Sequence, residues 1–297
     1  MGNFQGLHLS PTSVFITAVR RTSYTSYNPT FASLPFNSLA MLSLGMVFLH
    51  LVAFSAITTT NAAPEATATN TVNLRIEANT STLYEGPITS GPRNITVGSG
   101  NNKVTFICDD AGAMPSPPPP GNTPTDALDA AAKARGFTYG GGFDGEFNDF
   151  YFTRIGTSTE YDNGTYFQSW GSLVNYQVSK FGEGLTLSGC QQLVKAGDEV
   201  LWAFITVKGT DSSNTDLSVL FLKLAPTTVT VKKGKGTTVS VTDGRTGVVV
   251  QNASVAGVKT DADGKATLYF FETGFFQYKA HKTGDVRSNV MNVTVTD

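Results

Sequence analysis

The chain has few charged residues, few histidines and only two cysteines. Lys, Arg, Asp and Glu make up 15% of its 297 residues, and the formal net charge at pH 7 is −2. Because no basic run or stripe is present, the sequence gives no sign of nucleic acid as a partner. Two cysteines and three histidines are also too sparse for the usual zinc sites. The remainder, with 40% hydrophobic residues and 30 glycines, is typical of a β-rich globular protein.

A long apolar run occurs near the N-terminus. Residues 39–57 read LAMLSLGMVFLHLVAFSAI, and Thr60 and Ala62 after this run give the small-x-small pattern that signal peptidase accepts. We therefore expect residues 1–62 to form a signal-peptide region that is removed from a secreted protein.

Two alternatives concern this region. More residues precede the apolar run than a signal peptide normally has, so either an N-terminal extension is made or Met41 is the true initiator. Alternatively, residues 39–57 stay in the membrane as a type II anchor, with Arg20 and Arg21 holding the start of the span inside. We favour cleavage over the anchor.

The rest of the chain carries two marks of export. Cys108 and Cys190 are its only cysteines, and an even pair in an oxidising compartment is most simply one disulfide. This bond would close a loop of about 80 residues and contribute about 4 kcal/mol to stability. The second mark is a set of N-x-S/T glycosylation sequons, some at outward positions of alternating segments. They lie at Asn79, Asn94, Asn163, Asn252 and Asn292.

Prolines precede the best candidate helix. Residues 115–120 read PSPPPP, after which Thr123 fits an N-cap, Pro124 the first helical position and Asp126 the N3 position of a capping box. Gly136 stands where a left-handed C-cap residue belongs. We interpret the prolines as a rigid approach to this helix, and a PxxP docking site is the alternative. The predicted packing side consists of Ala127, Leu128, Ala131 and Ala132.

Short strands flank the predicted helix on both sides. Alternation begins in TVNLRIEA at residues 71–78, and residues 137–181 are rich in Phe, Tyr and Trp. The segments AGDEVLWAFITV and TDLSVLFLKLAP supply further strands, the second of them at residues 215–226. One helix laid across a mixed sheet predicts an α+β domain of the β-grasp type over residues 71–224.

The residue pattern of the sequence changes at about residue 225. Short alternating segments such as TTVTVKKG, TTVSVTDG and NVMNVTVTD follow at regular spacing, with turn signals between them and no helical pattern. Residues 225–297 therefore predict a small immunoglobulin-like β-sandwich. The expected fold class of the whole is mainly β, or α+β.

Several motifs of the first predicted domain stand in a characteristic order. They are RIE at 75–77, TDAL at 125–128, WGSLVN at 170–175 and GDEVLW at 197–202. Together they resemble a family of extracellular domains similar to the C-terminal domain of transcobalamin. The second motif is one residue tighter, and the third one residue longer, than in that family. The resemblance implies a β-grasp-like fold for a family that is mostly without assigned function.

The second predicted domain carries a resemblance of its own. VTDGRTGVVVQNASV and TDADGKATLYFFETGFFQYKA resemble invasin-type bacterial immunoglobulin-like modules. The pair of domains is similar to fungal secreted proteins described as surface cell-adhesion related, which implies binding at a cell surface or matrix. In transcobalamin the related domain closes over a corrinoid held by a large helical domain. The sequence has no counterpart of that helical domain, so we expect no cofactor.

The sequence offers few residues that could support catalysis by a nucleophile. His8 and His50 fall in the segment predicted to be removed, so a Ser-His-Asp or Cys-His arrangement would have to use His281. In the segment FQYKAH, His281 alternates with Tyr278 and Ala280 and is expected to face solvent. We therefore expect no enzyme of this class.

Carboxylates offer the other route to catalysis. Asp144, Glu146 and Asp149 lie in FDGEFNDF, and a glycosidase needs only two carboxylates placed across a cleft. Nothing in the sequence fixes their separation, and charged loop residues are far more common than catalytic pairs. A hydrolase using these residues stays an alternative to a non-enzymatic protein.

The segment DADGKATLYFFE resembles a calcium-binding loop, but its glycine does not stand where such a loop requires it. Asp261, Asp263 and Glu272 stand at positions 1, 3 and 12 of an EF-hand loop, but the glycine at 264 falls at position 4 instead of 6. A tight turn around residues 263–264 explains the pattern better. We expect no metal.

Aromatic residues are the main candidates for ligand contact. Tyr166, Phe167 and Trp170 lie in TYFQSWG, and adjacent residues of a strand cannot all face the core. Exposed aromatic faces are surfaces on which sugar rings or a planar ligand stack. Packing in the core, together with cover from a glycan at Asn163, is the alternative. Trp202 is expected in the core.

The leading hypothesis is a secreted, non-enzymatic surface or cell-wall-associated binding protein. Its expected partner is a cell-wall polysaccharide or a surface glycoprotein, bound by the first domain and displayed by the second. The alternative is a secreted carrier of a small molecule, either cobalamin-like or another planar ligand.

Overall fold

The computed structural model describes most of the chain beyond the predicted signal region. It covers residues 69–109, 120–145, 147–178, 180–181, 185–186, 189–208 and 219–297. The predicted signal region at 1–62, with the alternative anchor at 39–57, lies outside these ranges, as do residues 115–119 of the proline segment and Glu146. Among the residues covered, no helix is both long enough and apolar enough to cross a membrane.

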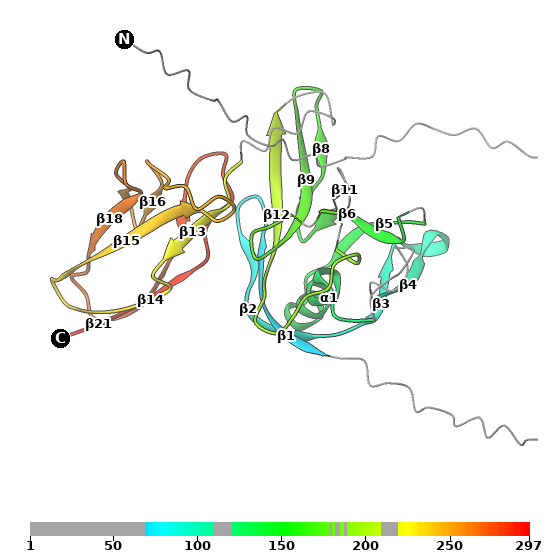
Figure 1. Ribbon diagram of the computed structural model, residues 1–297, viewed down its shortest axis with the longest axis horizontal. Coiled ribbons are helices and arrows are strands. Elements are labelled where there is room, and N and C mark those ends of the chain that lie inside the picture. Colours follow the sequence, from blue (N-terminus) through cyan, green and yellow to red (C-terminus); the bar gives the residue numbers. More distant parts are fainter. Residues whose placement is uncertain are drawn as a thin grey trace, which may run out of the picture. The chain divides into compact units, whose positions relative to one another are not determined.

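A mixed five-stranded sheet forms the centre of the first part of the molecule (Figure 1). Its central pair, β1 and β12, is parallel, and the other neighbours are antiparallel. In spatial order the strands are β2 (Thr82–Ser90), β1 (Asn70–Glu77), β12 (Glu199–Lys208), β9 (Tyr166–Val174) and β8 (Tyr161–Asp162).

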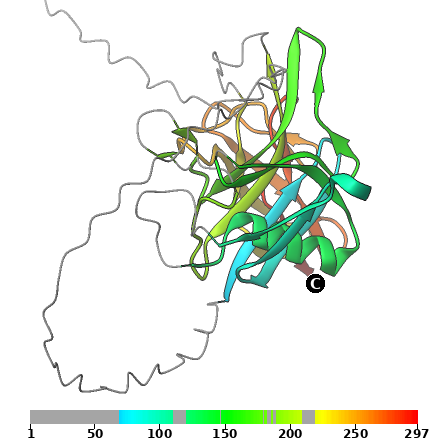
Figure 2. The same cartoon turned by 90° about the vertical axis from the view of Figure 1, so that its right-hand side faces the viewer.

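The helix α1 (Pro124–Arg135) forms as the sequence predicts. The Thr123 hydroxyl accepts a hydrogen bond from the backbone N–H of Asp126 at 3.2 Å, and the Asp126 carboxylate accepts one from the N–H of Thr123 at 2.9 Å. Gly136 ends the helix in the left-handed region with φ of 74°. Figure 2 shows α1 across the strands of the first part. The apolar side, Ala127, Leu128, Ala131 and Ala132, is buried as expected.

Smaller hairpins and one disulfide complete the first part. Cys108, at the end of β4, is bonded to Cys190, which lies 82 residues further along the chain. The predicted disulfide is therefore confirmed, and both sulfur-bearing residues are buried. The remaining elements are β3 (Arg93–Val97), η1 (Gly100–Asn102), β4 (Val104–Cys108), β5 (Tyr139–Asp144), β6 (Asp149–Ile155), β7 (Ser158–Thr159), β10 (Lys180–Phe181) and β11 (Leu185–Thr186).

The core of the first part lies between α1 and the central sheet. Aromatic rings meet there edge to face, as between Phe152 and Trp202, whose ring centroids are 5.3 Å apart. The indole N–H of Trp202 donates to the carbonyl of Pro124 at 3.0 Å, which ties the sheet to the first turn of the helix. Trp202 is thus a core residue, as predicted.

The second part of the molecule consists of short strands alone. Within the described residues they form three small sheets, in the orders β13-β15-β18, β14-β21-β19 and β17-β16-β20. Val293 and Val295 face inward on β21, whereas Thr294 is exposed, as the alternation predicts. The strands are β13 (Leu222–Ala225), β14 (Thr228–Lys232), β15 (Gly236–Asp243), β16 (Ser254–Val255), β17 (Val258–Lys259), β18 (Lys265–Tyr269), β19 (Gly274–Tyr278), β20 (Ala280–His281) and β21 (Met291–Thr296).

One strand belongs to a different sheet from the one that the sequence suggested. Residues 222–225 were expected to close the sheet of the first domain, but β13 pairs with β15, with Leu224 opposite Val241. Leu222 and Leu224 are buried in the core of the second part. The expected boundary between residues 224 and 225 therefore cuts a strand of the second part. The mainly β, α+β fold class is confirmed.

Candidate functional site

The structure separates the three aromatic residues that the sequence proposed as a binding site. Trp170 is only 9% exposed, packs in the core and donates its indole N–H to the carbonyl of Ser158 at 3.0 Å. This burial corresponds to the core-packing alternative and removes Trp170 from any exposed surface. Tyr166 and Phe167 are half-buried.

An exposed ring that the sequence analysis did not single out lies beside Tyr166. Tyr161 on β8 is 50% exposed, and its ring centroid is 5.8 Å from that of Tyr166. Tyr161 is paired with Gln168, and Gln168 with Thr206, so these side chains share one face of the sheet with Tyr166. The Gln168 amide donates to the Thr206 hydroxyl at 2.9 Å. We call Tyr161, Tyr166, Gln168 and Thr206 the tyrosine face.

A pocket lies where β1 ends and β12 continues. β1 pairs with β12 only as far as Glu77 and Ala203, and residues 204–208 of β12 then pair with β9 alone among the described strands. The pocket has a volume of 250 Å³, and Phe204 and Thr206 stand in its wall. The other lining residues are Glu77, Ala78, Asn79, Ile205, Val219, His281, Lys282, Thr283, Gly284, Asp285, Val286 and Arg287.

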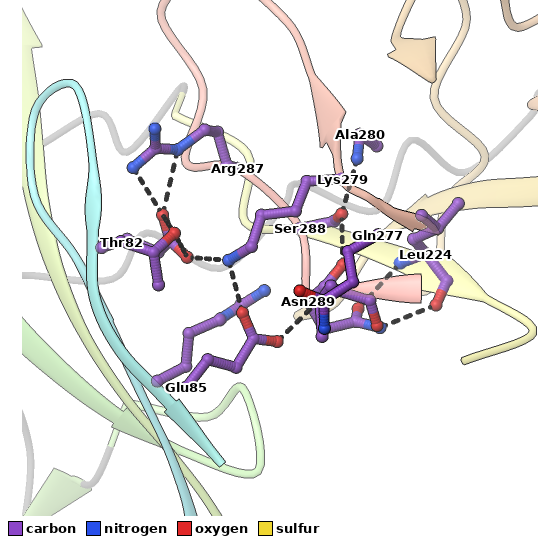
Figure 3. A network of polar contacts seen from close by, with 12 residues as sticks. Thr82, Glu85, Leu224, Gln277, Lys279, Ala280, Arg287, Ser288 and Asn289 are labelled. Carbon is purple, nitrogen blue, oxygen red and sulfur yellow. Dashed lines mark hydrogen bonds and ion pairs between the residues drawn. The ribbon is translucent and has the colours of Figure 1, made fainter. Parts of the chain in front are cut away.

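A cluster of charged residues adjoins the pocket (Figure 3). Glu77 is only 2% exposed, and its carboxylate accepts hydrogen bonds from the Arg287 guanidinium at 2.7 and 3.0 Å. Lys279 pairs with the same carboxylate and with that of Glu85, and Thr82 donates to Glu77 at 3.0 Å. A buried carboxylate with this many donors satisfies the conditions under which an internal ion pair persists. We call Glu77, Thr82, Glu85, Lys279 and Arg287 the Glu77 cluster.

The segment that carries Arg287 is itself fixed by hydrogen bonds (Figure 3). The Ser288 hydroxyl accepts from the N–H of Ala280 at 2.7 Å, and the Asn289 side chain bonds both the N–H and the carbonyl of Leu224. The N–H of Val290 donates to Glu85 at 2.6 Å. All these residues belong to one compact unit that includes residues 67–297. The Glu77 cluster therefore joins the end of β1 to the chain between β20 and β21.

A buried carboxyl group stands at the start of α1. Asp126 is 0% exposed, and burial raises its pKa from 3.8 to about 8, against the lowering effect of its hydrogen bonds from Thr123. The group therefore retains a proton at neutral pH in the folded protein. Its role in the capping box makes it a structural residue and not a candidate for catalysis.

The carboxylates proposed for a hydrolase lie on the β5–β6 hairpin. Asp149 is 3% exposed and accepts hydrogen bonds from the backbone N–H groups of Phe150 and Cys190, at 2.6 and 3.2 Å. Asp144 pairs across the hairpin with Asp149 and accepts from the N–H of Phe147 at 3.4 Å. These contacts indicate that Asp149 has a structural role.

The structure also places the other residues that the sequence analysis considered for catalysis or metal binding. Asp261 and Gly264 form a tight turn, in which the carboxylate of Asp261 accepts from the N–H groups of Asp263 and Lys265. His281 is exposed on β20, as expected. No group of three His, Cys, Asp or Glu residues in the described ranges is placed to hold a metal ion.

The five sequon asparagines differ in their surroundings. Asn79, Asn94, Asn163 and Asn252 are exposed, whereas Asn292 is half-buried and accepts a hydrogen bond from Gln277 at 2.9 Å. Asn163 caps the β8–β9 turn by accepting from two backbone N–H groups, so a glycan there would stand beside the tyrosine face.

The comparisons with known proteins give no family. The chain matches no protein-family model, and no curated protein is significantly similar to it.

Sequence reasoning missed the parts of this region that depend on long-range pairing. Tyr161 sits in a two-residue strand whose alternation is too short to read, and Glu77 meets Arg287 only in the folded chain, 210 residues later. The one signal that pointed to Glu77 was the RIE motif itself.

Proposed function

We propose that this protein is a non-enzymatic extracellular binding protein that attaches to a cell-wall polysaccharide or surface glycoprotein through the tyrosine face. The resemblances to transcobalamin-like and invasin-type domains belong to the same proposal, in which the second part displays the first. Export through a signal peptide, attachment to the wall and glycosylation at the sequons are its further elements.

The observation that carries the proposal is the pairing of two tyrosine rings beside an amide and a hydroxyl. Tyr161 is 50% exposed and lies 5.8 Å from Tyr166, while Gln168 and Thr206 continue the same face. Aromatic rings provide flat apolar surfaces, and neighbouring amide and hydroxyl groups provide hydrogen bonds. A sugar ring has one apolar face and a rim of hydroxyl groups, so both features match it.

Two features support binding at a surface over a carrier or a hydrolase. The pocket of 250 Å³ lies below the range of about 300–1,000 Å³ typical of sites for drug-sized ligands, and a corrinoid is larger still. Asp149 is held by backbone N–H groups in a buried position, which does not suit a carboxylate that must reach a substrate.

The test is retention of the secreted protein on insoluble glucan and chitin. We expect the native protein to be retained and the double variant Tyr161→Ala, Tyr166→Ala to be released. The matched control is Tyr269→Ala in the second part, which removes a tyrosine that is 60% exposed and should leave retention unchanged.

A further variant deals with the glycan at Asn163. If this glycan covers the tyrosines, Asn163→Gln should increase retention, and the binding face would then be masked in the glycosylated form. Equal retention of the native protein and of the double tyrosine variant would contradict the proposed site. A ligand that co-purifies with the protein and is seen by native mass spectrometry would favour the carrier.

A further inference from the structure

One of the five sequons, that of Asn79, lies at the pocket at the end of β1. Asn79 is among the residues that line this pocket, whereas the other four sequon asparagines are not. Asn79 is an exposed residue, as the acceptor of a glycan has to be. A glycan on Asn79 would start at the edge of an existing hollow, and glycans at the other sites would start elsewhere.

The backbone around Asn79 is held firmly. The N–H of Ala78 donates to the carbonyl of Ser81 at 2.9 Å, which closes a turn over the sequon, and the N–H of Asn79 donates to the Ser158 hydroxyl at 3.1 Å. The Arg287 guanidinium donates to the carbonyl of Thr80 at 2.8 Å. A sugar attached here would therefore leave the protein from a fixed point.

The pocket offers contacts of the kind that a sugar ring uses. Phe204 contributes a half-buried aromatic ring, whose centroid lies 5.3 Å from that of Trp170. Lys282, Thr283 and Asp285 belong to one loop, also line the pocket and contribute polar groups. The carboxylate of Asp285 accepts from the N–H of Leu220 at 3.0 Å, which anchors this loop. A lining that combines apolar and hydrogen-bonding groups suits a pyranose, which has both apolar C–H groups and hydroxyl groups.

We propose that the N-linked glycan of Asn79 places its first N-acetylglucosamine in this pocket, in contact with the loop at 282–285. The sugar would then brace the end of β1 against the loop that precedes Arg287, next to the Glu77 cluster. The inference rests on the proposed export of the protein, because glycosylation takes place in the secretory pathway.

The attachment requires a lipid-pyrophosphate-linked oligosaccharide as donor. The amide nitrogen of Asn79 forms the new bond to C1 of the first sugar and loses one proton. The bond between C1 and the pyrophosphate oxygen breaks, and the lipid pyrophosphate leaves with the electron pair. The sequon hydroxyl is that of Ser81.

The test compares three forms of the full secreted protein made with high-mannose glycans. One form is intact, one is trimmed by endoglycosidase H to a single N-acetylglucosamine, and one is stripped by peptide N-glycosidase F. We expect amide hydrogen exchange in residues 282–286 to be equally slow in the intact and trimmed forms. In the stripped form it should be roughly tenfold faster, the change that the loss of about 1.4 kcal/mol of local stability gives.

Two sequon variants provide the controls. Asn79→Gln should reproduce the faster exchange of the stripped form, and Asn252→Gln, which removes a sequon from an exposed turn of the second part, should not. With Asn79 shown to be occupied in the intact protein, the same exchange rate in residues 282–286 in the intact, trimmed and stripped forms would overturn the proposal. An unoccupied Asn79 beside occupied sequons would also overturn it while leaving export intact. Five unoccupied sequons would overturn both this inference and the proposed export.

Discussion

The cores of the two parts of the molecule differ in their aromatic content. In the first part, Phe150, Phe152 and Trp202 are 2%, 4% and 3% exposed and fill the core between helix and sheet. In the second part the core is largely aliphatic, and three aromatic residues lie at the surface. Tyr269, Phe271 and Phe275 are 60%, 69% and 63% exposed.

Whether an aromatic side chain is buried or exposed follows from its position in the register of its strand and not from its hydrophobicity. On β18, Ala266 and Leu268 occupy the inward positions, so Tyr269 falls on the outward face. Tyr269 stands opposite Gly236, where a Cβ atom would come within 2.9 Å of the tyrosine ring. The missing side chain of the glycine lets the ring lie close to the strand. Aromatic content alone therefore does not locate a core.

The largest expected effect comes from a pair of matched truncations. Phe150→Ala should reduce the free energy of unfolding by about 4 kcal/mol, because it leaves a cavity in the core. Phe271→Ala should change it by no more than about 0.5 kcal/mol, because its ring already lies in solvent. Urea unfolding of the two variants measures both values. Similar losses would contradict the contrast between the two parts.

The disulfide provides a second difference, since its two cysteines both lie in the first part. Replacing Cys108 and Cys190 with serine removes a bond across 82 residues and should cost about 4 kcal/mol. Both tryptophans, Trp170 and Trp202, also lie in the first part, so their fluorescence reports its unfolding directly. We expect the fluorescence transition to move to lower urea concentration. An unchanged midpoint would show that the crosslink contributes nothing.

The Glu77 cluster is a largely buried ionic connection between the two parts, whereas the Glu199–Lys223 pair is an exposed one. Glu77→Gln leaves Arg287 and Lys279 with one anionic partner fewer in a largely buried setting, and we expect a loss of about 3 kcal/mol. The control is Glu199→Gln, whose 3.8 Å pair with Lys223 is about half exposed and should contribute no more than about 0.5 kcal/mol. Equal effects in urea unfolding would argue against a special role for the cluster.

A further expected effect is a dependence on pH that comes from Asp126 in the first part. Burial raises the pKa of Asp126 to about 8 in the folded protein, above its ordinary value of 3.8. The folded state thus keeps a proton that the unfolded chain releases between these values, so stability is present at low pH and falls as pH rises towards 8. Asp126→Asn does not titrate and should lose less stability between pH 5 and pH 8. Parallel curves for the two proteins would contradict this.

Local features of the fold were predictable from the sequence, and distant pairings were not. The capping box at Thr123 and Asp126 is written in four consecutive residues, and the alternation at 291–296 gives the inward positions of β21 directly. The disulfide followed from the presence of only two cysteines. β13 was misplaced because alternation says that a strand exists but not which sheet it joins.

The candidate site was predicted only in part, for the same reason. Tyr166 was identified from its sequence context, but Trp170 proved to be buried, because outward and inward positions cannot be told apart where both faces of a strand are apolar. Tyr161 joins Tyr166 only through the pairing of β8 with β9. The partners of Glu77 come from the far end of the chain.

The central claim is that the exposed rings of the first part bind a polysaccharide and those of the second part do not. The most direct measurement is a binding isotherm on insoluble glucan and chitin for two variants. One carries Tyr161→Ser and Tyr166→Ser, and the other carries Tyr269→Ser, Phe271→Ser and Phe275→Ser. We predict at least about tenfold weaker binding for the first, a change of about 1.4 kcal/mol, and native binding for the second. Native binding by the first variant, with loss of binding by the second, would contradict the account and move the site to the second part.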